Sequence, residues 1–100
     1  MSLRDPERPQ PLQVSQAAIQ HQDGTVFTVP RPGRHGNVFQ LMLAERGLGA
    51  YKGSIQGFVT NLGQFVTRKE AAQIAFREKQ YKPEQMPDEP QQTLMTEDLW

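Results

Sequence analysis

The hydrophobic positions of the sequence fall into short strand-like runs and into longer stretches with helical spacing. The first two runs, Gln13 to His21 and Thr25 to Val29, are separated by Gln22-Asp23-Gly24. An Asp-Gly step between two such runs is a strong signal for a two-residue hairpin turn. We therefore predict an antiparallel hairpin over this part of the chain.

A second pair of strand-like runs follows later, at Gln56 to Thr60 and Gln64 to Val66. The residues between them, Asn61-Leu62-Gly63, suit a three-residue connection in which the final glycine has positive φ, where a Cβ would clash. This part of the chain predicts a second tight hairpin.

A helix start signal comes directly after the second hairpin. Thr67 is followed three residues later by Glu70, so each side chain can accept a hydrogen bond from the other residue's backbone amide. On the predicted helix, an apolar row runs along one face and Lys79 continues it, which makes the helix amphipathic. The apolar positions are Ala71, Ala72, Ile74, Ala75 and Phe76.

An earlier helix is predicted from Asn37 to Arg46. Asn37 can cap its start, and Gly47 or Gly49 can end it. Its apolar stripe consists of Val38, Phe39, Leu41, Met42 and Leu43. In the glycine-rich connection that follows, Tyr51 has no obvious place in either neighbouring element.

The order of these elements, ββαββα, predicts an α+β fold in which a small antiparallel sheet is covered by two helices. We expect residues 1–11 to be a flexible arm, residues 12–80 to be a single domain and residues 81–100 to be an extended C-terminal tail. The tail ends in Leu99-Trp100. Such an apolar end is typical of an anchor that packs on the body of the chain or on a second protomer; the alternative is a free tail.

Composition narrows the function classes. A formal net charge of zero argues against a protein that coats nucleic acid through counterion release. The chain contains neither an apolar run of about 20 residues nor the apolar core of a signal peptide, so we expect a cytoplasmic protein with no membrane partner. A small core without cysteine leads us to expect stabilisation by homo-oligomerisation.

Two segments are candidates for phosphate binding. The loop from Arg31 to Asn37 brings Arg31 and Arg34 to a predicted helix start, where free amides favour anions. The alternative is a solvated basic turn. In the second helix, Arg68 and Lys69 occupy the first turn, where the macrodipole disfavours cations. Glu70, a bound phosphate or the acidic residues of a returning tail can compensate them.

Phe58 lies beside Gly57 in the second hairpin and is either a core residue or a platform for a nucleobase. His21 and His35 lie in different elements, and neither has partners at the spacing of a catalytic triad or a metal site. We therefore expect no enzyme activity, no cofactor and no metal.

The stretch GFVTNLGQFVTRKEAAQIA, the upstream TVFTVPRPGRHGNVFQLM and the terminal TEDLW together resemble the Thoeris anti-defence protein 1 family. These are phage-encoded sponges that bind and sequester a cyclic ADP-ribose isomer made by bacterial TIR-domain defence enzymes, without cleaving it. The resemblance covers about Val14 to Trp100. It implies action in the infected bacterial cell, and a homodimer or a higher homo-oligomer such as a hexamer, with cyclic oligonucleotides held at a separate site in some assemblies.

The resemblance also implies which residues contact the ligand. The aromatic stacking role falls on Phe58, the phosphate contacts fall on Arg34 and Arg68, and an Arg-His pair falls on Arg34 and His35. Asn61 and Thr67, from the same matched stretch, complete the expected ligand-binding set.

Three functions remain in competition at this point. The first is the sponge just described. The second is a phage protein-interaction module that docks through the TEDLW tail, with the basic loops as solvent features. The third is a nucleotide hydrolase, which is disfavoured because the sequence shows no evident carboxylate cluster for Mg²⁺.

Overall fold

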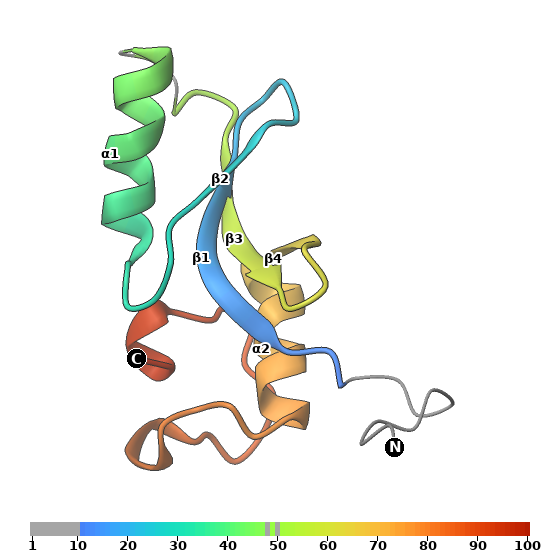
Figure 1. Ribbon diagram of the computed structural model, residues 1–100. Helices are drawn as coiled ribbons and strands as arrows, with labels where there is room; N and C mark the ends of the chain where they lie inside the picture. Colours follow the sequence, from blue (N-terminus) through green and yellow to red (C-terminus); the bar gives the residue numbers. More distant parts are fainter. Residues whose placement is uncertain (1–10, 48, 50) are drawn as a thin grey trace, which may run out of the picture.

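The computed structural model describes residues 11–47, 49 and 51–100, so almost all of the expected N-terminal arm lies outside the described residues. The chain forms a four-stranded antiparallel sheet with two α-helices in the order ββαββα, which confirms the predicted fold class (Figure 1). The sheet order is β2-β1-β3-β4. The elements are β1 (Val14–Gln20), β2 (Val26–Thr28), α1 (His35–Arg46), β3 (Ile55–Thr60), β4 (Phe65–Thr67) and α2 (Arg68–Arg77).

Both predicted hairpins are present. In the first, the amide of His21 donates to the carbonyl of Thr25 at 2.7 Å, so the connection has three residues rather than the two that the Asp-Gly step suggested. In the second, the amide of Thr60 donates to the carbonyl of Gln64 at 2.9 Å, and Gly63 has a φ of 82°. The three-residue turn with a left-handed final glycine is therefore confirmed.

The helix boundaries differ from the predicted ones. Helix α1 begins two residues earlier than Asn37, which occupies its third position and accepts a 2.9 Å hydrogen bond from the Arg34 amide through its side chain. Helix α2 begins after Thr67, as the capping pattern predicts, and both reciprocal bonds with Glu70 are present. It ends at Arg77, because Lys79 adopts a positive φ of 55°.

The described residues form a hydrophobic cluster between the sheet and the two helices. Helix α1 packs on β1 and β2, and helix α2 packs on β1, β3 and β4. Phe76, one of the apolar positions of the second helix, is only partly buried and packs against this cluster from its edge. None of the helices in the described part of the chain is both long and apolar enough to cross a bilayer. The largest fully buried side chains are Phe58, Ile19, Met42, Leu94, Val14 and Val38.

After α2 the chain turns back toward the start of α1 (Figure 1). Residues 94–100, which we call the C-terminal segment, contain a short 3₁₀ helix at Thr96–Asp98. Leu94 and Leu99 are 0% and 8% exposed and belong to the main hydrophobic cluster. The C-terminal segment therefore packs on the body of its own chain, which was one of the two partners expected for the tail.

Candidate functional site

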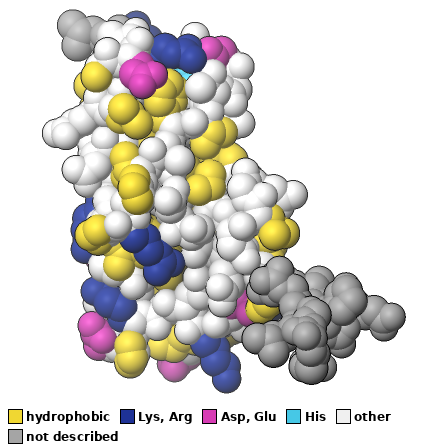
Figure 2. All heavy atoms as spheres, viewed as in Figure 1, with side chains coloured by type: hydrophobic (Ala, Val, Ile, Leu, Met, Phe, Trp, Pro, Cys, Tyr) yellow, Lys and Arg dark blue, Asp and Glu magenta, His cyan; other side chains and the backbone are white. Residues whose placement is uncertain are grey.

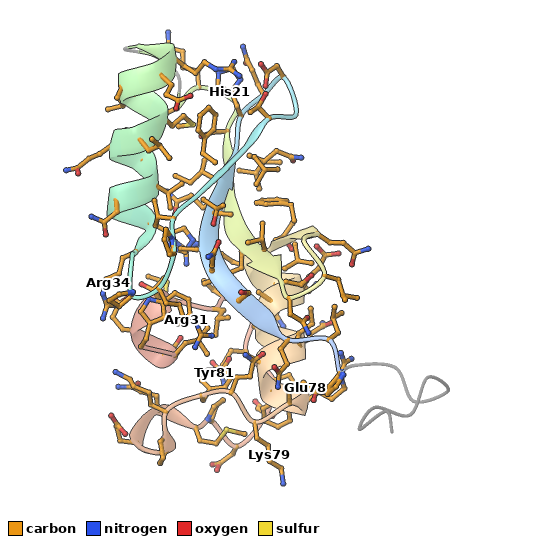
Figure 3. All side chains as sticks on the ribbon, viewed as in Figure 1. His21, Arg31, Arg34, Glu78, Lys79 and Tyr81 are labelled. Atoms are coloured by element: carbon orange, nitrogen blue, oxygen red, sulfur yellow. The ribbon has the colours of Figure 1, made fainter. Side chains whose placement is uncertain are left out.

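Arg34 lies immediately before α1, and its guanidinium reaches the C-terminal segment. Nη1 donates to Thr96 Oγ1 at 3.2 Å and to Glu97 Oε1 at 3.4 Å, and Nη2 donates to the backbone oxygen of Trp100. The labelled Arg31 and Arg34 side chains both extend from this loop toward the C-terminal segment (Figure 3). The predicted phosphate-binding loop is therefore in contact with an acidic segment.

Arg68 reaches the same segment from the first turn of α2. Its Nη1 donates to the carbonyl of Leu94 and lies 3.3 Å from the Met95 Sδ, while Nη2 donates to Gln56 Oε1 at 2.6 Å. The side chain is half-buried. Burial lowers the pKa of Arg68 from its usual value, and the charge of Glu97 opposes this shift.

Glu97 feels the positive charge of both arginines. Its pKa lies below the usual value because its own backbone amide and the Thr96 hydroxyl bond the carboxylate, and because Arg34 and Arg68 add favourable charge. The Glu97 side chain is 64% exposed. Arg34 thus contacts this solvent-accessible carboxylate, and the charge of Arg68, at the other helix start, favours the same carboxylate from a longer distance. The position of the Glu97 carboxylate is therefore one where an anion is favoured.

Phe58, the expected stacking residue, packs against His35 and the C-terminal segment. It is 0% exposed, with the ring of His35 at 4.9 Å and the ring of Trp100 at 6.4 Å, both edge-on. While the C-terminal segment is in place, a nucleobase cannot reach this ring. In this conformation Phe58 is a core residue, which was one of the two alternatives.

Arg31, which the sequence placed in the candidate phosphate-binding loop, contacts Trp100, which was predicted only as part of an anchor. The Arg31 guanidinium lies 4.2 Å from the centre of the Trp100 ring, and the indole Nε1 donates to the carbonyl of Gly33 at 3.0 Å. Basic side chains gather over this loop and the adjoining C-terminal segment (Figure 2). The presence of two arginines in one short loop was a signal for Arg31, but its position on Trp100 depends on the return of the tail.

His35 contacts the same core through a defined tautomer. Its Nε2 lies 2.7 Å from the carbonyl oxygen of Gly57, and because a carbonyl can only accept, Nε2 carries the proton. Burial lowers the pKa of His35, helped by the charge of Arg68 and opposed by the Gly57 bond. The neutral imidazole therefore holds the start of α1 against β3.

The lowered pKa values of His35 and Glu97 predict that acid reduces the free energy of unfolding in two steps. As the pH falls below 6.5, the ordinary pKa of histidine, the unfolded chain takes up a proton that folded His35 resists, so the free energy of unfolding decreases. As the pH falls below about 4.5, Glu97 is protonated more easily in the unfolded chain, and its contribution is lost.

Urea unfolding at a series of pH values measures both steps. His35→Gln should remove the upper step, whereas His21→Gln, in the first hairpin, should keep it. Fluorescence of Trp100, the chain's one tryptophan, should follow unfolding of the C-terminal segment together with the rest of the domain in both steps. An upper step that persists in His35→Gln would contradict the assignment.

Two of the expected ligand-binding residues use their side chains for structural bonds. Asn61 donates to the carbonyl of Pro11 and accepts from the amide of Gln13, both at 2.9 Å, and Thr67 caps α2. Asn61 lines a separate polar hollow of about 400 Å³. The hollow is lined by Gln13, Val14, Ser15, Gln16, Arg31, Asn61 and Gln80. The structure therefore groups Arg34, His35, Phe58 and Arg68 around the C-terminal segment, without Asn61.

The remaining candidate chemistry is limited. Among residues 11–47, 49 and 51–100, no group of three histidine, cysteine or acidic residues is placed to hold a metal ion. His21 lies in the first hairpin, where its Nδ1 is 3.1 Å from Asp23 Oδ1. Arg46 also bonds Asp23 at 2.7 Å, and this bond holds the pKa of the Asp23 carboxyl well below its usual range.

A protein-family model described as "Phage T4 y16D protein" matches residues 13–100. The match includes the whole sheet, both helices and the C-terminal segment. No curated protein and no solved structure matches the chain.

Proposed function

The chain belongs to the phage T4 y16D protein family, and from this premise we propose that it is a phage anti-defence protein that sequesters a cyclic ADP-ribose isomer. It captures the signal without cleaving it and so blocks Thoeris-type immunity. The mechanism is mass action, in which tight binding keeps the free signal below the concentration that its effector needs.

The observation that carries this proposal is that Arg34 and Arg68, from two different helix starts, both reach the C-terminal segment. Arg34 contacts the Glu97 carboxylate at 3.4 Å, and the charge of Arg68 acts on the same carboxylate from beyond ion-pair distance. Paired guanidiniums are the protein groups best suited to the oxygens of a pyrophosphate, because each offers a planar fork of donors. A pyrophosphate that replaces the Glu97 carboxylate would again place negative charge near both guanidiniums.

Capture then requires the ligand to compete with the C-terminal segment. The Glu97 carboxylate is exposed and can leave, whereas Leu94 and Leu99 are buried in the main cluster. Burial of these anchors on the chain's own body also weighs against the rival function, in which the TEDLW tail docks on a different protein.

Calorimetric titration with a panel of cyclic nucleotides, run beside light scattering, tests the proposal. We expect saturable binding of a cyclic ADP-ribose isomer, intact ligand on release by heating, and the mass of a homodimer or a higher homo-oligomer. Hydrolysed ligand would instead indicate an enzyme. The rival function is favoured if the protein binds no nucleotide but captures a protein partner. Deleting residues 96–100 should then abolish that capture.

A further inference from the structure

A second cleft lies beside the arginine site, between α1 and β3. It has a volume of about 410 Å³ and is lined by Ile19, Phe39, Tyr51, Ser54 and Gln56. This volume is within the range of about 300–1,000 Å³ that is common for small-molecule sites. The cleft gives a place to Tyr51, which neither predicted helix nor strand could accommodate.

Two aromatic rings form one side of the cleft. The Phe39 and Tyr51 rings have centroids 6.4 Å apart and planes inclined at 58°, so they do not stack on each other. Tyr51 is 54% exposed, so a face of its ring is open to a ligand in the cleft. An exposed tyrosine face is suited to stacking with a flat heterocycle, and such stacking does not depend on a particular base.

The loop that carries Tyr51 is held in position by its own hydrogen bonds. The Ser54 amide and hydroxyl both donate to the Tyr51 carbonyl, at 3.0 and 2.6 Å. These bonds fix the backbone that carries the ring before any ligand arrives, which lowers the entropy cost of binding. Because the Ser54 hydroxyl donates within the loop, its lone pairs are what it can offer to a ligand in the cleft.

Gln56 links the cleft to the arginine site. Its Oε1 accepts a 2.6 Å bond from Arg68, so its NH₂ group is the donor that it can present to a ligand. The cleft thus offers the Gln56 NH₂ group as a donor and the Ser54 hydroxyl oxygen as an acceptor, next to the aromatic face of Tyr51. The Arg68 guanidinium bonds the other end of the same Gln56 amide. A purine base attached to a phosphate matches this arrangement of groups.

We propose that this cleft receives the purine base of the nucleotide, stacked on Tyr51, while the adjoining phosphates bind at Arg68. This inference rests on the proposed function and assigns the base to Tyr51 in place of Phe58, which is 0% exposed. Phe39 provides the apolar wall, and Gln56 reads the edge of the base.

The test measures binding of the cyclic ADP-ribose isomer to Tyr51→Ala by calorimetry. We expect the dissociation constant to rise by about 5- to 150-fold, which is the usual effect of losing one stacked base. Tyr51→Phe should bind within about threefold of the natural protein, because it keeps the ring. Ile55→Ala is the matched control, since Ile55 is 48% exposed and does not line the cleft.

A second readout uses AMP as a probe with isotopically labelled protein. We expect the amide resonances of Tyr51, Ser54 and Gln56 to shift, and those of the first hairpin to stay in place. If the natural protein binds the cyclic nucleotide but Tyr51→Ala binds it equally well, this inference is wrong and the proposed function stands. If the natural protein binds no nucleotide, both are overturned.

Discussion

Replacing Phe58 by alanine should lower the free energy of unfolding by about 3–5 kcal/mol, the range for large aromatic residues in well-packed cores. The ring is 0% exposed and contacts His35 and Trp100 edge-on. A domain of this size has about 5–15 kcal/mol of stability in total. The loss would therefore remove a large share of it, and urea unfolding followed by far-ultraviolet circular dichroism measures this loss.

Leu62→Ala is the control for that measurement. Leu62 lies in the second hairpin turn and is 61% exposed, so its truncation should change the free energy of unfolding by no more than about 0.5 kcal/mol. A cost below about 1 kcal/mol for Phe58→Ala would mean that the ring is not in the core. That outcome would restore Phe58 as a candidate for stacking with a nucleobase.

Local signals in the sequence were sufficient for the fold class. The second hairpin and the start of α2 each depend on residues within a few positions of one another, namely the Asn61-Leu62-Gly63 turn and the Thr67–Glu70 capping pair. The predicted start of α1 was wrong because the Asn37 side chain can accept a bond from a free backbone amide at the third helical position as well as at the cap. In the structure it accepts from the Arg34 amide. The end of α2 was misplaced because a left-handed Lys79 leaves no sequence signal.

The candidate site was only partly predictable because it is assembled by tertiary contacts. The electrostatics of helix starts was sufficient to predict Arg34 and Arg68 as site residues. It also predicted that the acidic residues Glu97 and Asp98 of the tail are one way to compensate the cations at the start of α2. The contact of Glu97 with Arg34, and the cover that Trp100 provides over Phe58, depend on where the tail returns. A sequence pattern carries no information about that path.

Within the described chain, the structure also separates the acidic pair into two roles. Glu97 interacts with the arginines, whereas Asp98 accepts a 3.0 Å bond from the Met95 amide and so closes the short 3₁₀ helix. The C-terminal segment is therefore held by its own turn and by its buried leucines as well as by charge. This arrangement allows the Glu97 carboxylate to be replaced without release of the whole segment.

Arg34→Ala and Arg68→Ala should each weaken capture of the cyclic nucleotide by about 10- to 150-fold. This corresponds to the loss of charge-assisted hydrogen bonds worth about 1.5–3 kcal/mol. The two effects should not be additive, because both guanidiniums interact with the same carboxylate position. Titration calorimetry of the single and double variants measures the affinities and the coupling.

The stability of the same variants separates binding from anchoring. Arg68→Lys keeps the charge but loses the fork that reaches both Leu94 and Gln56, so its affinity should fall toward that of Arg68→Ala. Arg77→Ala, at the exposed end of α2, is the control and should bind normally. If Arg34→Ala and Arg68→Ala lower the melting temperature but bind the nucleotide normally, the two arginines only anchor the C-terminal segment, and the phosphates must bind elsewhere.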